Sequence, residues 1–475
     1  MSSNMYDPAL PLTWSIQGIS DDGSNNILIV PKTHEGLDFP PLHLFCILDD
    51  DSESRALSQA WKTHDQPEAT SARDNMLEII AARLTNWSNS RTFRQLLKRI
   101  TIGSTIHISS ISVPEKGAAM WLAPNLALQE RYLTLHRLSS LWASYSLDLP
   151  PVLDIQQIQT VRRLHDSVSL VTTPNEPLVV FKGAVSVISR MYHELRELLR
   201  MPHHPNVIGK PRYIVTREIQ GVEESVVCGF ILDFHSGGTL LDRLSYPSQY
   251  PPITIKDKLK WIRQILQALQ HIHCPGGSFY PELRLENIVL SDNNDIILVD
   301  LEQFGGPERW LHPRLGRINE AIHDTWEHSR VNPCSMSPSI FYSNPTAGYM
   351  LPFARSSDLQ RQTFENYSLA KVMWCIFEEQ TNSSTRLDDN STLHPGVTQI
   401  MFPQFVKTPE KMKYWIWLCT RSSREWGDMR CRCEDHQSDI CEHLGAKLQK
   451  TNLAYVSLKE TEEYLHSVFD DLDTL

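Results

Sequence analysis

The chain has 475 residues and a formal net charge of −11 at pH 7, and 41% of its residues are hydrophobic. This length favours more than one domain, and the composition allows a large core. An acidic chain without a basic tail or stripe argues against a nucleic-acid partner. No apolar run approaches the roughly 20 residues of a membrane span, and the beginning lacks a signal-peptide pattern. Nine scattered cysteines indicate a reducing compartment, so we expect a cytoplasmic or nuclear protein without a membrane partner.

The first part of the chain mixes strand-like and helix-like patterns. Apolar runs at 26–31 and 42–48 predict short strands, whereas the polar, acidic residues 49–73 predict a loop. Residues 75–98 and 118–147 carry apolar side chains at helical spacing. We therefore expect a mixed α/β region that lacks a recognisable chemical motif. It would be a structural or regulatory domain packed on the domain after it.

A Leu-Pro-Pro sequence at 149–151 marks the expected domain boundary. Two candidate strands come next, at 155–164 and 167–172, and the turn between them contains Asp166 but no glycine. A further apolar strand at 177–182 ends in a lone lysine, and apolar spacing predicts a helix after it. This order predicts a β-rich domain crossed by one helix.

One stretch near the middle of the chain combines side chains that suit phosphate and metal chemistry. Two apolar runs, 287–290 and 296–299, flank an Asn/Asp-rich turn and predict a β-hairpin. Glu282 and Asn287 lie at one end of this hairpin, and Asp300 follows the other strand. Two acids and an amide brought to one place can orient a hydroxyl group and hold a divalent metal ion on oxygen ligands.

This stretch resembles the catalytic and metal-binding loops of protein kinases, which read H-R-D-L-x-x-x-N and, after a hairpin, D-F-G. The first loop here reads YPELRLEN from Tyr280 to Asn287, and the second reads DLE from Asp300. The D-[FL]-E-Q form resembles in particular a divergent kinase-like family of filamentous fungi. The resemblance implies that Asn287 and Asp300 hold magnesium and that Glu282 replaces the acid that accepts the substrate hydroxyl proton.

Further kinase motifs occur in the family's order. Lys182 resembles the lysine of V-A-I-K, which contacts nucleotide phosphates. The family pairs this lysine with a glutamate on the next helix, before an H-P-N turn, and that turn stands here at 204–206. Glu194 lies at the expected spacing, and Glu197 is its rival. The resemblance therefore implies a Lys182–Glu194 pair at a nucleotide site.

The strand expected at 226–232 runs into a sequence that resembles the hinge between kinase lobes. There, backbone groups meet the adenine, which implies contacts at Asp233 and His235. Leu232 would line the back of the nucleotide pocket. The glycines at 237 and 238 then lead into the next helix.

The resemblance implies an α+β, two-lobe protein-kinase-like fold, with the mixed α/β region of residues 1–150 in front of it. Residues 151–235 would form the β-rich N-lobe, and residues 236–425 would form the helical C-lobe. Within the C-lobe we expect an amphipathic helix at 256–273 and a buried helix at 364–377.

The remaining residues, 426–475, form a tail with two features. An amphipathic helix is expected at 458–472, docked on the body of the protein. Before it, five soft ligands lie close together in the sequence and could hold a structural zinc ion, with free thiols and solvated histidines as the simpler interpretation: Cys431, Cys433, His436, Cys441 and His443.

Three functions agree with these patterns. The first is a divergent Ser/Thr protein kinase that uses ATP and Mg²⁺, with Glu282 as the base that orients the substrate hydroxyl and a protein as substrate or partner. The second is a pseudokinase that senses nucleotide or binds a protein as a scaffold, which the glycine-free turn at Asp166 favours. The third is a small-molecule kinase, which the acidic spacing of Asp300 and Glu302 favours.

Overall fold

In the computed structural model, the chain divides into two compact units. The first unit comprises Met1–Leu195 and Pro211–Phe234, and the second comprises Arg196–Lys210 and His235–Leu475. The structure describes these residues: 13–21, 27–33, 41–62, 67–90, 93, 100–112, 119–165, 167–185, 188–219, 223–273, 278–303, 310, 312, 356–381, 405–420 and 456–472.

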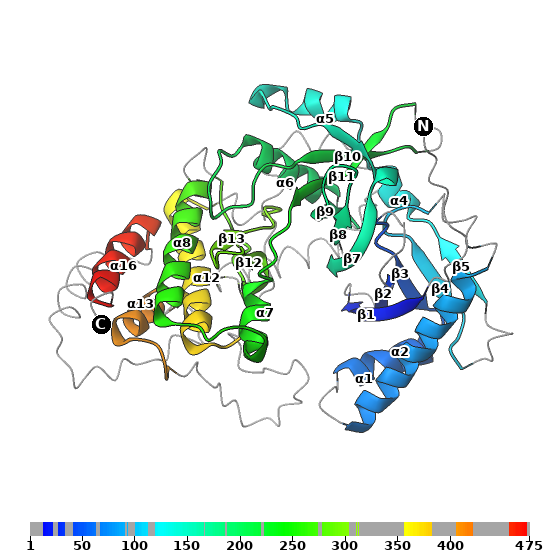
Figure 1. Ribbon diagram of the computed structural model, residues 1–475, viewed down its shortest axis with the longest axis horizontal. Coiled ribbons are helices and arrows are strands. Elements are labelled where there is room, and N and C mark those ends of the chain that lie inside the picture. Colours follow the sequence, from blue (N-terminus) through cyan, green and yellow to red (C-terminus); the bar gives the residue numbers. More distant parts are fainter. Residues whose placement is uncertain are drawn as a thin grey trace. The chain divides into compact units, whose positions relative to one another are not determined.

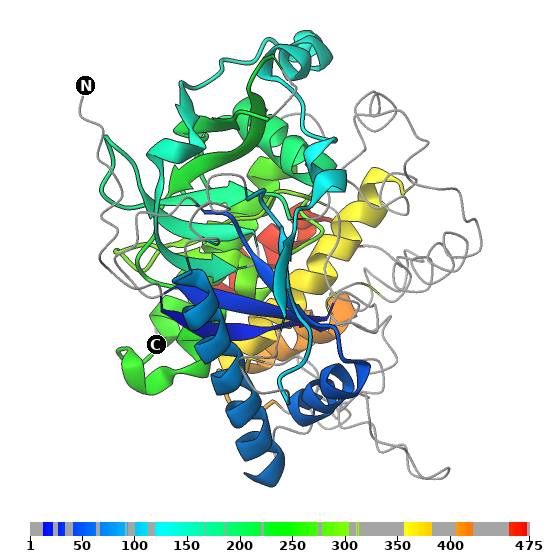
Figure 2. The same ribbon diagram turned by 90° about the vertical axis from the view of Figure 1, so that its right-hand side faces the viewer.

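The first unit begins with a five-stranded sheet in the order β1-β2-β3-β4-β5. Its strands are β1 Trp14–Asp21, β2 Ile27–Thr33, β3 Phe45–Leu48, β4 Thr105–Ile108 and β5 Met120–Ala123. Neighbouring strands are antiparallel, except that β3 and β4 are parallel. A parallel pair needs a long crossover, which here contains α1 Asp51–Lys62 and α2 Pro67–Ser88. These helices pack on each other and against β1 and β3 (Figures 1 and 2).

The loop predicted at 49–73 is wrong, because α1 and the start of α2 occupy it. Asp50 caps α1, since its Oδ1 accepts the backbone N–H groups of Ser52 at 2.9 Å and Glu53 at 3.1 Å. Among the described side chains of α1, five are exposed and four are buried, of which Glu53 and Ser54 are polar. A helix whose buried face is partly polar looks like a polar loop in the sequence.

The helical prediction for 118–147 is wrong at its beginning. Residues Met120–Ala123 form β5, which pairs along its whole length with β4. Only two short α-helices come after it, α4 Leu126–Gln129 and α5 Leu135–Leu141. Apolar content alone does not separate a short strand from a segment of helix, and the pairing with β4 identifies this segment as a strand.

A six-stranded sheet completes the first unit, in the order β6-β10-β11-β9-β8-β7. Its strands are β6 Val152–Asp154, β7 Gln159–His165, β8 Val168–Thr172, β9 Val179–Gly183, β10 Tyr213–Arg217 and β11 Val226–Asp233. The strand predicted at 155–164 begins four residues later, at Gln159, because the 3-10 helix Ile155–Gln157 occupies its start. The strands predicted at 167–172, 177–182 and 226–232 are confirmed to within about two residues at each end. Helix α6, Ile188–Arg200, follows β9 as predicted.

The N-terminal region packs on this second sheet, as expected. Nε2 of His43 lies 3.0 Å from Oγ of Ser169 on β8. From β7, Arg163 donates to the Leu44 carbonyl oxygen at 2.8 Å, and its guanidinium carbon lies 5.0 Å from the ring centroid of Phe45. Burial lowers the pKa of His43, and Arg163 adds to this effect, so the imidazole is neutral in the interface.

The second unit is mainly helical (Figure 1). Its α-helices are α7 Leu240–Ser245, α8 Ile255–His273, α12 Asp358–Glu378, α13 Glu410–Thr420 and α16 Leu458–Leu472, and its one described hairpin joins β12 Ile288–Leu290 to β13 Ile296–Leu298. The hairpin and the long helices were predicted. The short 3-10 helices are η2 Ala143–Tyr145 and η3 Ile155–Gln157 in the first unit, and η4 Pro247–Gln249 and η5 Leu285–Asn287 in the second.

Helix α12 forms the centre of the second unit. Every residue from Thr363 to Glu378 is buried, which is typical of a helix surrounded by others. Helices α8, α13 and α16 all pack against it. The terminal helix docks as predicted, because Thr461 Oγ1 donates to Asn366 Oδ1 at 2.8 Å and Gln270 donates to Glu462 at 2.8 Å.

The described chain is therefore a mixed α+β protein in which a β-sheet region is followed by helices. Within the described ranges, no helix combines the length and the apolar character that crossing a membrane requires.

Candidate functional site

A buried ion pair joins β9 to α6 in the first unit. Nζ of Lys182, at the end of the apolar strand, lies 2.5 Å from Oε2 of Glu194. The two side chains are 7% and 0% exposed. Such a pair neutralises both charges, and removing either partner leaves an uncompensated buried charge. Of the two candidate glutamates, Glu194 is the one that lies against Lys182.

Glu197 serves a different network, at the end of α6 that belongs to the second unit. Its Oε2 lies 2.6 Å from Nη2 of Arg200 and accepts the hydroxyl of Ser278 at 2.7 Å. Arg196 lies 3.2 Å from its other oxygen. This network ties the last turn of α6 to the segment that leads into the expected catalytic loop.

The expected hinge residues Leu232 and Asp233 end β11, and His235 follows it. Leu232 is buried and stands opposite Val180 in the ladder with β9. The Asp233 carboxylate accepts a hydrogen bond from Arg212, and this bond is the main reason why the pKa of Arg212 is raised. Any nucleotide contact at Asp233 therefore falls to its backbone. His235, two residues after Asp233, belongs to the second unit.

The expected catalytic loop is fastened to the core of the second unit through Tyr280. The backbone N–H of Tyr280 donates to Oε1 of Glu365 on α12 at 2.7 Å. The hydroxyl of Tyr280, which is fully buried, donates to the carbonyl oxygen of Val299, directly before Asp300. One side chain thus connects the catalytic loop to the expected metal loop.

Glu365 is a buried acid without a cationic partner in the described part of the chain. Burial raises its pKa to about 8, and the bond from the Tyr280 amide only partly offsets this. Its second oxygen, Oε2, makes no hydrogen bond to the described residues. Burial therefore favours the protonated, neutral form of Glu365 at pH 7.

The amide of Asn287 joins the two motifs. Its Nδ2 donates to the carbonyl oxygen of Glu282 at 3.1 Å and to Oδ2 of Asp300 at 3.3 Å. Because the nitrogen makes both bonds, the amide oxygen is the atom that Asn287 can offer to a metal ion. The Glu282 residue is buried. Asp300 adopts a positive φ of 67°, a conformation that non-glycine residues seldom hold without a local reason.

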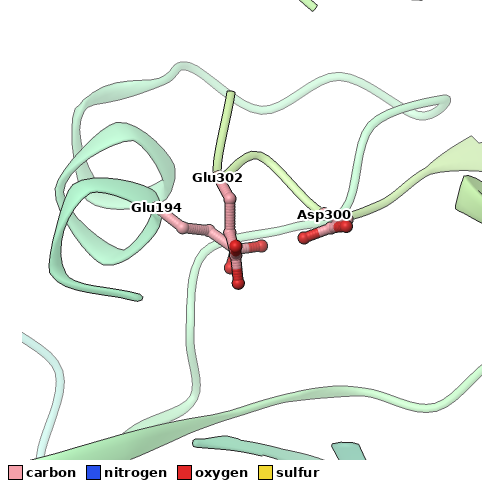
Figure 3. Close-up of side chains that lie close together, drawn as sticks. All are labelled: Glu194, Asp300 and Glu302. Atoms are coloured by element: carbon pink, nitrogen blue, oxygen red, sulfur yellow. The ribbon is translucent and has the colours of Figure 1, made fainter. Parts of the chain in front are cut away.

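A second acid lies beside Asp300. One carboxylate oxygen of Glu302 lies within 4.8 Å of one from Asp300, and both residues come from the segment after β13 (Figure 3). Arg284 partly balances this charge, with Nη2 3.9 Å from Oδ2 of Asp300. The available donors are two carboxylates and an amide oxygen, which are the hard ligands that Mg²⁺ prefers. These residues therefore fit a magnesium ion.

Neither Arg284 nor Glu302 was among the site residues expected from the sequence. Arg284 stands two residues after Glu282, and a basic residue inside an acidic, metal-binding loop is a usable signal for a phosphate contact. The spacing of Asp300 and Glu302 pointed to phosphoryl chemistry without identifying Glu302 as a ligand.

Two expectations lie outside the described residues. One is the position of Asp166 in the glycine-free turn between β7 and β8. The other is the possible zinc cluster of Cys431, Cys433, His436, Cys441 and His443.

Comparisons with known proteins give partial matches. No protein-family model matches the chain. The chain is 26% identical over 104 residues to the hormonally up-regulated neu tumor-associated kinase homolog of Xenopus tropicalis, covering 22% of this chain and 13% of that protein. It is 28% identical over 109 residues to the probable serine/threonine-protein kinase WNK5 of Oryza sativa subsp. japonica, covering 23% of this chain and 30% of that protein. The matches span less than a third of either relative and indicate a kinase-like protein.

Proposed function

We propose that this chain is a divergent protein kinase with a two-lobe fold, which binds MgATP and transfers a phosphoryl group to a Ser or Thr hydroxyl of a protein. One observation carries the proposal. The Asn287 amide binds both the Glu282 carbonyl oxygen and the Asp300 carboxylate. The hydroxyl-orienting loop and the metal loop are thereby held together, as phosphoryl transfer by positioning requires.

Each residue has a separate task in this proposal. Lys182, with its charge supported by Glu194, binds nucleotide phosphate. Asn287 and Asp300, with Glu302 beside them, hold Mg²⁺, which neutralises charge on the phosphates when bound. The backbone at Asp233 and His235 and the side chain of Leu232 receive the adenine.

Glu282 would orient the acceptor hydroxyl and accept its proton. A glutamate reaches about one ångström further than an aspartate, and a misplacement of about 1 Å can cost 100-fold in rate. The backbone bond from Asn287 to Glu282 fixes where the side chain begins. We therefore expect turnover that is slow but dependent on this carboxylate.

The test measures MgATP binding first and turnover second. In a thermal-shift assay, MgATP should raise the melting temperature of the wild type. The substitutions Asp300→Asn and Lys182→Met should each abolish this increase. Asp292→Asn, which changes an exposed acid at the turn of the same hairpin, should retain it. Glu282→Gln should keep the MgATP shift and lose about 10²–10⁴-fold in phosphoryl transfer to a Ser/Thr peptide.

Other outcomes separate the alternatives. A shift that depends on Asp300, without any turnover, would identify a nucleotide-binding pseudokinase. The closeness of Glu302 to Asp300 favours a second candidate, transfer to the hydroxyl of a small molecule. Label from γ-labelled ATP would then appear on small polyols or amino alcohols and never on peptides. The absence of any MgATP shift in the wild type would refute both kinase proposals.

A further inference from the structure

The N-terminal region meets helix α6 at a tyrosine two residues before Glu194. The hydroxyl of Tyr192 accepts the backbone N–H of Leu133 at 2.9 Å and donates to the carbonyl oxygen of Val227 at 2.7 Å. Tyr192 is fully buried. This one hydroxyl therefore joins three elements of the first unit: α6, β11 and the segment between α4 and α5.

The same segment also bonds directly to β11. The Val227 N–H donates to the Leu133 carbonyl oxygen at 2.8 Å, and Thr134 forms an antiparallel bridge with Val226. Leu133 is thus fixed to the sheet on one side and to α6 on the other. Because both polar groups of Leu133 are used, the segment has one defined position between strand and helix.

The N-terminal region also contacts the segment that connects β9 to α6. Tyr132 donates its hydroxyl to the carbonyl oxygen of Ala184 at 3.4 Å. Gly103 has a positive φ of 72°, and a Cβ at this position would lie 3.2 Å from the carbonyl oxygen of Val185. The N-terminal region therefore contacts the chain just after Lys182 and again just before Glu194.

The helix geometry explains how these contacts act on the ion pair. Residues two apart on an α-helix project about 200° apart around its axis. Tyr192 therefore points away from the side on which Glu194 meets Lys182. A contact on the Tyr192 side fixes both the rotation and the height of α6, and these two quantities decide whether Glu194 reaches Lys182.

We propose that the N-terminal region regulates the kinase-like site by holding α6, with Tyr192 as the positioning residue that keeps Glu194 against Lys182. This inference rests on the proposed function for its consequence, because positioning of this helix controls the lysine–glutamate pair in kinases. The contact itself does not depend on that function. The N-terminal region is then a built-in regulatory domain, and a change in its fold is transmitted to the nucleotide site.

The first experiment measures the ion pair without nucleotide. Tyr192→Phe in the full chain removes both hydroxyl bonds while keeping the ring. Tyr464→Phe is the matched control, because it removes a buried tyrosine bond of 2.6 Å to the Lys411 carbonyl oxygen in the second unit. Acylation of Lys182 by an amine-reactive ester and hydrogen exchange along α6 are both read by mass spectrometry.

We expect Tyr192→Phe to raise the acylation rate of Lys182 roughly tenfold, the order that the loss of its two buried hydrogen bonds supports. Exchange along α6 should rise with it, and the control should change neither quantity. If Lys182 and α6 behave alike in the two variants, Tyr192 does not position the pair and the inference is wrong.

The second experiment tests the consequence for nucleotide. Tyr192→Phe should weaken MgATP binding several-fold in the wild type and have no effect in a Glu194→Gln background, because it acts only through Glu194. An equal loss in both backgrounds would overturn the inference. If the wild type binds no MgATP while Lys182 still responds to Tyr192→Phe, the proposed function fails and the positioning role stands.

Discussion

Two buried glutamates, Glu194 in the first unit and Glu365 in the second, are stabilised in different ways. In the first unit, Glu194 lies 2.5 Å from the ammonium group of Lys182. In the second unit, Glu365 accepts a hydrogen bond from the backbone of Tyr280, and burial raises its pKa to about 8. The first acid is neutralised by a cation and the second by a proton.

The ion pair of Glu194 places a charge at the candidate site, whereas Glu365 has a structural role only. The ion pair with Glu194 holds the ammonium group of Lys182 in a defined place, where a nucleotide phosphate can contact it. A protonated Glu365 presents no charge to Asp300 and Glu302, so it holds the catalytic loop without adding to the acidity beside the expected metal ion. The protein therefore supports its loop with a neutral group and reserves charge for Lys182 and the metal ligands.

The largest effect should come from breaking the ion pair of the first unit. Lys182→Met leaves Glu194 buried without its cation, and breaking a buried pair costs about 3–5 kcal/mol. The free energy of unfolding, measured by urea denaturation at pH 7, should fall by that amount. Adding Glu194→Leu to Lys182→Met should recover most of the loss, since an apolar pair replaces the charges. A single variant as stable as the wild type would show that Lys182 does not neutralise Glu194.

The pH dependence of stability should distinguish Glu365 from Glu194. Below pH 4.5, the ordinary pKa of the side chain, both folded and unfolded states hold the proton, whereas between 4.5 and about 8 only the folded state does. Stability therefore falls as pH rises through this window, on the order of 4 kcal/mol in total. Glu365→Gln, which is neutral at every pH, should remove this slope in urea unfolding from pH 5 to 9.

Glu378 on the same helix provides the control. Burial opposes its ionisation, but hydrogen bonds from Thr408 and from the backbone N–H groups of 406–408 leave its pKa below the usual value. An acid with a lowered pKa loses its stabilising effect only at low pH. Glu378→Gln should therefore lower stability evenly between pH 5 and 9. A slope that persists in Glu365→Gln would mean that Glu365 is already ionised in the folded protein.

The elements that could be predicted from the sequence are those whose pattern is local. The hairpin around Asn287, the amphipathic helices expected at 256–273 and 458–472 and the buried helix expected at 364–377 each show their period within the segment itself. Helix α1 could not be recognised in this way, because two of its buried side chains, Glu53 and Ser54, are polar and hide the apolar period. Strand β5 can be recognised only from its pairing with β4, which precedes it by more than ten residues.

The candidate site shows the same limit. Glu194 and Glu197 stand three residues apart on one helix, where they share a face, so sequence spacing left both as partners of Lys182. The bond from Tyr280 to Glu365 joins residues 85 apart, and that from Leu133 to Tyr192 joins residues 59 apart. Neither bond has a periodic signature. The motif residues were thus predictable, whereas the residues that position them were not.

A smaller effect should result from crowding the backbone of the second unit, where the support is structural rather than charged. At Gly237, a Cβ would lie 2.5 Å from the Leu290 carbonyl oxygen and 2.8 Å from its Cβ. Gly237→Ala should therefore cost about 1–3 kcal/mol, as overpacking usually does. Gly209→Ala, where a Cβ meets nothing within 4 Å, should change stability by less than about 0.5 kcal/mol. Equal melting temperatures for the two variants would contradict a close approach at Gly237.

The smallest effect should come from breaking an exposed ion pair. Comparing it with the buried Lys182–Glu194 pair isolates the contribution of burial to the stability of an ion pair. Lys459 lies 3.8 Å from Glu463 one turn further along α16, and the two side chains are 82% and 64% exposed. Lys459→Met makes the same substitution as Lys182→Met, but water solvates Glu463 when its partner is lost. We expect a change of about 0.5 kcal/mol or less, reduced further in 1 M salt. If Lys459→Met and Lys182→Met cost the same in urea unfolding, burial would not be the source of the strength of the Lys182–Glu194 pair, and the contrast between the two buried glutamates would fail with it.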